Sequence, residues 1–224
     1  MIAVVLGAML LESAVVAGIP PSRDGEKLTI VNGFAFVDVS IGGKGPFRMM
    51  IDTGATSCSL SPESAKAAGL VMDYRVVFPY LIDYRQKLLW LGDEAVRQAA
   101  SLRTEIAAER ADGRMVLPVG MESGGGRWRL TLDTGANALV IRCGARCPKL
   151  RDAHGGDRIV TNAGSCAVRR GIVHHVTVGT MIIPRAEAAL VDGPVRASED
   201  GVLPASWFSA VYVDSARNLV RLRW

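Results

Sequence analysis

Hydrophobic and polar residues alternate over short stretches of this chain, and turn-forming residues separate those stretches. The alternation is clearest in Val37-Asp38-Val39-Ser40-Ile41, which has the two-residue period of a half-buried β-strand. Short strands are expected at 28–31, 34–41, 127–132 and 174–178, with turns at 32–33, 42–45 and 124–126. The pattern therefore predicts an all-β fold.

Two segments depart from this alternation and have the composition of helices. In residues 61–70, Ser61 suits the N-cap, Pro62 suits the first helical position, and Gly69 suits the helix end. Residues 94–106 are rich in helix-forming residues. We expect this second segment to connect two halves of the chain, with a strand that begins at Leu102 as the alternative.

The N-terminal segment is almost wholly apolar over residues 2–17, and Glu12 interrupts the apolar run. That charge makes a membrane-spanning helix unfavourable, while the small residues Val15 and Ala17 suit cleavage after export. We therefore expect an export signal within residues 1–24, a periplasmic or secreted protein, and only transient membrane contact through this segment. An N-terminal core helix or a misassigned start codon is the alternative.

The sequence Asp-Thr-Gly-Ala occurs twice, each time after apolar residues. Asp52 to Ala55 follows Met-Met-Ile, and Asp133 to Ala136 follows Leu-Thr-Leu. From average residue frequencies, one given tripeptide occurs by chance in only about one of a few dozen chains of this length. Two copies with matching flanks therefore indicate two related halves, each with one carboxylate at the tip of a glycine-shaped turn.

Facing each other, two such loops would bring the carboxylates of Asp52 and Asp133 to about 3 Å, where both cannot ionise and one proton is shared. The ionised carboxylate would be the general base toward a water, and the protonated one would polarise the carbonyl group under attack. The roles would then reverse to protonate the leaving amine, so a peptide bond is hydrolysed without a covalent intermediate, a metal or a cofactor. Residues expected to brace the pair and shape the turns are Thr53, Thr134, Gly54, Gly135, Ala55 and Ala136.

These two loops resemble the active-site loops of aspartic proteases of the pepsin and retropepsin type. Residues 200–214 resemble the family's closing strand, short helix and last hairpin, although Pro204 stands where the family has glycine. Residues 159–165 lie where the flap would be, which is the hairpin that covers the substrate. The resemblance implies a retropepsin-like acid-protease barrel with two pseudo-symmetric halves, and an aspartic endopeptidase with Asp52 and Asp133 as catalytic residues. An extended peptide or protein substrate would pair in a strand-like manner with the flap residues Asn162, Ala163, Gly164 and Ser165.

The two halves differ in length. A matching hairpin follows each motif, and its aspartate comes 31 residues after Asp52 but 81 residues after Asp133. We therefore expect the first half to lack its flap and a supporting strand. The predicted organisation is an N-terminal apolar segment (1–24), a truncated first half (25–91), a connection (92–111) and a complete second half (112–224).

Two other arrangements stay open. Residues 112–224 have about the length of one retropepsin-like subunit, so two chains could form a homodimer in which Asp133 faces its own copy. The chain could instead be a catalytically inactive module of the same fold that binds extended peptides without cutting them.

Charge and cysteine content bear on other functions. The net charge is +4 and the sequence pI is about 9.0, but the arginines are scattered and no nucleic-acid motif is present, so no nucleic-acid partner is expected. One disulfide is expected among Cys143, Cys147 and Cys166 in an exported protein, with the pairing open, while Cys58 would be a small buried residue. The cysteine and histidine spacings fit a zinc site poorly, and no metal is expected.

Overall fold

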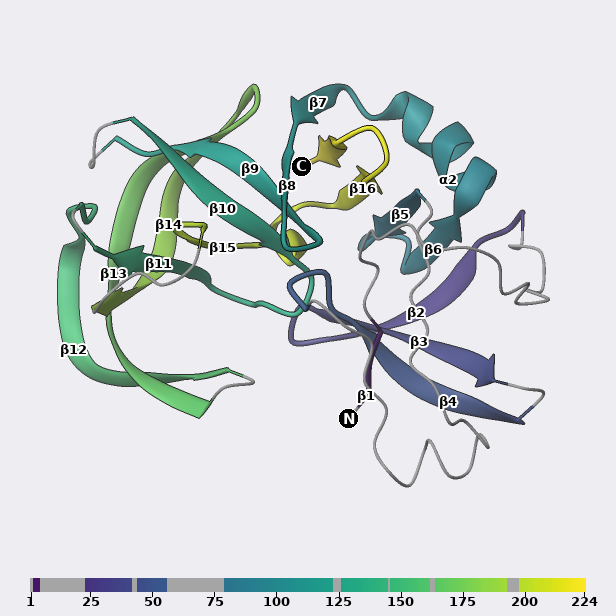
Figure 1. Ribbon diagram of the computed structural model, residues 1–224, viewed down its shortest axis with the longest axis horizontal. Coiled ribbons are helices and arrows are strands. Elements are labelled where there is room, and N and C mark those ends of the chain that lie inside the picture. The colour runs from purple at the N-terminus through teal and green to yellow at the C-terminus, as the bar shows by residue number, and fades with distance from the viewer. Residues whose placement is uncertain are drawn as a thin grey trace.

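The computed structural model describes residues 2–4, 23–41, 44–55, 79–122, 126–144, 146–161, 164–192 and 198–224 (Figure 1). In these residues the chain is mostly β-strand and forms a nine-stranded and an eight-stranded sheet. The predicted all-β fold is therefore confirmed. The predicted helix at 61–70, most of the N-terminal apolar segment, and Cys58 lie outside the described residues. Within the described part, no helix has the length and apolar character needed to cross a membrane.

The nine-stranded sheet has the order β1-β4-β3-β2-β6-β5-β16-β17-β7 and so combines the beginning, middle and end of the chain. The turn between β2 and β3 is the predicted one at Asn32 and Gly33, whose φ angles of 52° and 84° suit a two-residue hairpin. The strands of this sheet are β1 Ile2–Val4, β2 Glu26–Val31, β3 Phe34–Ile41, β4 Lys44–Ile51, β5 Tyr80–Asp83, β6 Leu88–Leu91, β7 Thr104–Ala107, β16 Ala210–Asp214 and β17 Leu219–Arg223.

The eight-stranded sheet has the order β12-β13-β14-β11-β15-β10-β9-β8 and lies on the other side of the molecule (Figure 1). Strand β10 runs parallel to β15, and this pairing sets Asp133 beside Pro204. The strands are β8 Glu109–Ala111, β9 Arg114–Gly120, β10 Arg127–Asp133, β11 Leu139–Cys143, β12 Arg151–Thr161, β13 Gly164–Val178, β14 Met181–Asp192 and β15 Gly201–Pro204.

Two equivalent hairpins, β5–β6 and β16–β17, join the halves of the molecule. Strand β5 pairs antiparallel with β16. An aspartate at the end of the first strand caps each turn, since the backbone N–H of Gln86 donates to Asp83 Oδ1 at 2.7 Å and that of Arg217 donates to Asp214 Oδ1 at 3.1 Å. The two matching hairpins predicted from the sequence are therefore confirmed.

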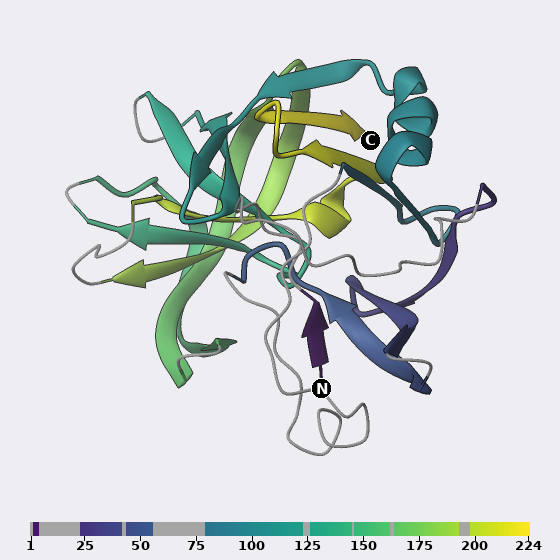
Figure 2. The same ribbon diagram turned by 45° about the vertical axis from the view of Figure 1, so that its right-hand side comes forward.

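The segment 94–106 was expected to be a helix-forming connection, with a strand that begins at Leu102 as the alternative, and the structure contains a helix followed by a strand. Helix α2 (Gly92–Gln98) and a 3-10 turn (Ala99–Ser101) cover one face of the β5–β6 hairpin (Figure 2). Strand β7 then follows, close to the alternative of a strand that begins at Leu102, and it pairs with the edge of β17. Strand β8 then pairs with β9, so both sheets take a strand from this segment.

The hydrophobic core anchors the two strands that carry the motifs. Ile51 is the last residue of β4 and Leu132 is the last apolar residue of β10; they are 0% and 1% exposed and belong to one core cluster. Burial of the residue before each aspartate therefore fixes the point at which each strand ends and its loop begins.

Candidate active site

The two Asp-Thr-Gly loops meet within one chain. Each glycine lies against the opposite aspartate: a Cβ atom added to Gly54 would come within 2.4 Å of Asp133 Oδ2, and one added to Gly135 within 2.7 Å of Asp52 Cγ. No side chain fits into either space, so glycine is needed for the carboxyl groups to approach. The structure thus brings together the two predicted catalytic residues, one from each half.

The threonines of the two motifs exchange hydrogen bonds in a reciprocal pattern. The backbone N–H of Thr53 donates to Thr134 Oγ1 at 3.0 Å, and that of Thr134 donates to Thr53 Oγ1 at 3.1 Å. The hydroxyl of Thr53 donates to the carbonyl of Leu132 at 2.8 Å, and that of Thr134 donates to the carbonyl of Ile51 at 2.7 Å. All four hydrogen bonds are buried and cross from one half to the other, so they lock the loops in register.

Backbone donors orient both carboxyl groups. Asp52 Oδ1 accepts the N–H groups of Gly54 and Ala55, each at 3.0 Å, and Asp133 Oδ1 accepts the N–H of Gly135 at 2.6 Å. The N–H of Gly54 also acts on the carboxyl group of Asp133. Hydrogen bonds of this kind favour the ionised form of a carboxyl group.

Burial, the charge of Asp52 and a hydrogen bond with the Asp52 carboxyl group together raise the pKa of Asp133 to about 7, and burial is the largest of these causes. The N–H groups of Gly135 and Gly54 act in the opposite direction. Since two carboxylates this close cannot both ionise, the pair holds one proton in the acidic to neutral range. One neutral and one ionised carboxyl group are the arrangement that general acid–base chemistry requires.

Two tyrosines near this pair were missed in the sequence analysis. Tyr80 in β5 is fully buried and is hydrogen bonded to the side chain of Thr53, and the hydroxyl of Tyr84 is buried without a partner among the described residues. Burial raises the pKa of both phenols, and the charge of Asp133 adds to the rise. Both therefore stay neutral beside the dyad. Their local sequence, Tyr-Leu-Ile-Asp-Tyr, carries no signal of this approach.

The predicted flap segment forms the end of a long hairpin made by β12 and β13. Gly164 begins β13, and the hydroxyl of Ser165 accepts a hydrogen bond from Arg158 Nε at 2.8 Å. Asn162 and Ala163 lie outside the described residues. A role of this hairpin in substrate binding stays a prediction.

The closing segment differs from its prediction in one respect. Pro204 is the last residue of β15 and precedes a 3-10 turn, Ala205–Trp207, that stands in place of the predicted short helix. Its φ of −64° is the value to which the proline ring restricts the backbone. Proline is therefore accommodated beside Asp133 as the end of a strand and not as the first residue of a helix.

A disulfide joins Cys143 and Cys147, and Cys166 is a free thiol. This settles the pairing that the sequence left open. In the described ranges, one group of side chains has the spacing to hold a metal ion, formed by these two cysteines with Asp192. The disulfide engages both sulfur atoms, so the group does not fit a metal ion in this oxidised form.

Residues 37–77 match a family model described as aspartyl protease. The matched segment begins in β3 and contains the first Asp-Thr-Gly loop, which meets the second loop in the structure. No curated protein is similar enough to the chain to match it. The match and the all-β fold support the aspartic protease family that the repeated motif indicated.

Proposed function

We propose that this protein is an aspartic endopeptidase in which Asp52 and Asp133 form the catalytic dyad. The observation that carries the proposal is the reciprocal hydrogen bonding of Thr53 and Thr134, which fixes the two carboxyl groups face to face. The raised pKa of Asp133 adds support, because a shared proton is what this chemistry needs.

In the proposed mechanism, Asp52 takes a proton from a water molecule while the oxygen of that water attacks the carbonyl carbon of the substrate. Asp133 donates its proton to the carbonyl oxygen, and a neutral tetrahedral diol forms. As the diol collapses, the amine nitrogen takes the proton held by Asp52, the C–N bond breaks, and a diol hydroxyl returns a proton to Asp133. Both carboxyl groups are then in their starting states, and no cofactor takes part.

The proposed substrate is an extended peptide or protein segment that pairs with the β12–β13 hairpin as an additional strand. We also propose that the protein acts after export. The Cys143–Cys147 disulfide supports that location, because disulfides persist in oxidising compartments.

Cleavage of a mixed peptide library between pH 3 and 7, with and without pepstatin, tests the proposal. We expect pepstatin-sensitive cleavage, and a loss of at least about a hundredfold in Asp52→Asn and in Asp133→Asn. Asp38→Asn is the matched control, because Asp38 is an exposed aspartate on β3. Absence of cleavage by the folded protein at every pH, in monomer and dimer fractions alike, would contradict it.

Two alternatives predict different outcomes of the same experiment. A peptide-binding module would bind library peptides without cutting them. Two observations favour this second candidate, the short first half and the position of Pro204 beside Asp133. A homodimer with two copies of Asp133 in its dyad would keep its activity in Asp52→Asn. Loss of activity in Asp52→Asn supports the dyad within one chain.

A further inference from the structure

Strand β7 has one unpaired edge. It is the last strand of the nine-stranded sheet, and β17 is its one strand partner in the described part of the chain. Ala108 N–H donates to the Asn218 carbonyl at 2.9 Å. In an antiparallel ladder, residues that exchange hydrogen bonds with the partner strand alternate with residues that do not. Ile106, two residues before Ala108, therefore bonds to β17. The N–H and C=O groups of Glu105 and Ala107 point to the free edge.

A groove of about 460 Å³ runs along this edge. One wall is β7, and the other contains Pro118 and Gly120 of β9 and Gly179 in the turn between β13 and β14. Figures 1 and 2 both show that turn beside β7. Its glycine lies close to the strand, since a Cβ atom added to Gly179 would be 2.9 Å from Ile106 Cγ1. The volume is in the range of pockets that hold a ligand.

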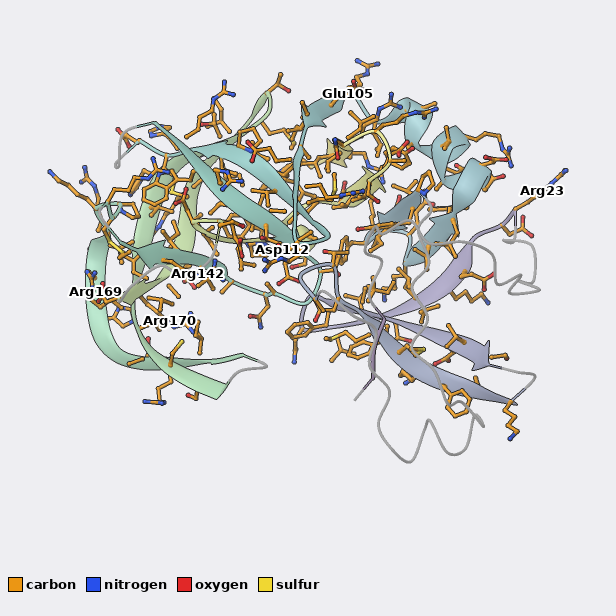
Figure 3. The ribbon with its side chains drawn as sticks, viewed as in Figure 1. Arg23, Glu105, Asp112, Arg142, Arg169 and Arg170 are labelled. Atoms are coloured by element: carbon orange, nitrogen blue, oxygen red, sulfur yellow. A yellow bond between two sulfur atoms is a disulfide. The ribbon has the colours of Figure 1, made fainter. Side chains whose placement is uncertain are left out.

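The charges around the groove favour an acidic occupant. Glu105, which is labelled in Figure 3, forms an ion pair with Arg221 at 2.8 Å, so its charge is compensated. Arg127 also lines the groove, and it forms no ion pair with any residue that the structure describes. Its guanidinium group therefore leaves an uncompensated positive charge.

Exposed edge strands are usually protected by proline, by a bulge or by uncompensated charge. Strand β7 contains no proline, and the charge of its one ionisable residue, Glu105, is neutralised by Arg221. The edge therefore keeps its hydrogen-bonding groups available, and the groove beside it has room for an added chain.

We propose that this groove is a docking site for an extended acidic peptide, which adds a strand to the free edge of β7. The N–H and C=O groups of the peptide bond to those of Glu105 and Ala107, and a peptide carboxylate pairs with Arg127. The site is separate from the Asp52–Asp133 pair, and binding there involves no covalent step.

Fluorescence anisotropy on the full chain tests this site, with a fluorescein-labelled hexapeptide of alternating valine and glutamate as the probe. Ala107→Pro removes an N–H that points into the groove and leaves the bonds to β17 in place, and we expect about tenfold weaker binding. Arg127→Glu should weaken binding by at least about tenfold and favour the same peptide with lysine in place of glutamate. Arg103→Glu is the matched control, because Arg103 is exposed, precedes β7 and does not line the groove, and its binding should stay within about twofold.

A peptide N-methylated at alternate amides should bind more weakly than the parent, since it loses its cross-strand donors. Saturating pepstatin should leave probe binding unchanged. Displacement by pepstatin, or equal affinity of the three variants once circular dichroism shows that they are folded, would overturn the proposal. Self-association that Ala107→Pro abolishes would also overturn it, because a second copy would then be the occupant. A protein that binds in the expected pattern but cleaves nothing would support this site while contradicting the proposed protease activity.

Discussion

The two aspartates of the site have identical side chains but different surroundings. Asp52 accepts the N–H groups of Gly54 and Ala55, whereas Asp133 is buried against Asp52 and has a pKa raised to about 7 by burial and by that neighbour. This difference is the reason that the proposed mechanism gives the acid role to Asp133 and the base role to Asp52. It also links the site to the stability of the whole fold.

Asp133→Asn should therefore change the pH dependence of stability. An unfolded chain releases the Asp133 proton near pH 4, while the folded protein keeps it up to about pH 7. The folded state thus binds more protons between these values, and the free energy of unfolding of the wild type falls as pH rises through this window, by about 3–4 kcal/mol at most. Asparagine does not titrate, so the variant should gain stability relative to the wild type from pH 4 to pH 8.

Urea unfolding at pH 4, 6 and 8 measures this effect. Asp38→Asn, which changes an exposed carboxyl group, should show a much smaller pH-dependent difference from the wild type. A difference between wild type and Asp133→Asn that stays constant with pH would contradict the raised pKa.

Among the elements, β4 and β10 are held together at their ends by the threonine hydroxyl groups. Thr53→Val keeps the shape of the side chain but leaves the N–H of Thr134 and the carbonyl of Leu132 without their buried partner. We expect a loss of about 2–3 kcal/mol in the free energy of unfolding. Thr131→Val on β10 is the matched control, because the hydroxyl of Thr131 is buried without a partner in the described chain. That change should be neutral or stabilising, and equal losses in the two variants would argue against the hydroxyl exchange.

The Cys143–Cys147 disulfide closes a short loop after β11, before the chain enters the β12–β13 hairpin. For a loop of this length, the loss of chain entropy in the unfolded state predicts a stabilisation of about 2 kcal/mol. A double Cys143→Ala, Cys147→Ala variant should lose this amount in chemical denaturation, and dithiothreitol should have the same effect on the wild type. Cys166→Ala should keep the sensitivity to dithiothreitol, because Cys166 is a free thiol. Insensitivity of the wild type to the reductant would contradict the prediction.

Prediction from the sequence succeeded where local chemistry determines structure. The Asn32-Gly33 turn and the clean alternation of residues 37–41 required no knowledge of the rest of the fold. The repeated motif likewise indicated two loops, because a strand followed by Asp-Thr-Gly specifies its own turn.

Prediction failed where a distant partner determines structure. Residues 94–106 have helix-forming composition, but the segment ends in a strand at 104–107 that pairs with β17, which comes more than a hundred residues later. Tyr80 and Tyr84 approach the dyad through the fold of the β5–β6 hairpin, and no local pattern reports that approach. The pairing of Cys143 with Cys147 could not be predicted either, because it depends on how the chain packs around the end of β11.

At the scale of the whole molecule, the two halves share a sheet and a core. Strands β5 and β16, one from each half, pair with each other, and one core cluster contains residues from both halves. The loops with Asp52 and Asp133 meet above this shared structure. This shared structure supports the proposal of a dyad formed within one chain.

An ion pair between the halves provides the test of this shared structure. Arg223 Nη2 and Asp83 Oδ2 are 2.5 Å apart, and the Asp83 side chain is only 4% exposed. Arg223→Met leaves this carboxylate buried without its cationic partner, so we expect a loss of about 3 kcal/mol in the free energy of unfolding. Arg48→Met breaks a pair whose members are 61% and 48% exposed, and should cost no more than about 0.5 kcal/mol.

Because Asp83 belongs to the first half and Arg223 to the second, Arg223→Met should lower the stability of both halves together. Fluorescence of Trp90 and Trp128, each followed alone in a variant with the other tryptophans replaced by phenylalanine, reports on the first and the second half. Coincident transitions that shift equally in Arg223→Met indicate one cooperative unit. Separate transitions, or a shift confined to one probe, would mean that the halves fold independently, and the dyad between them would then depend on docking and not on a common core.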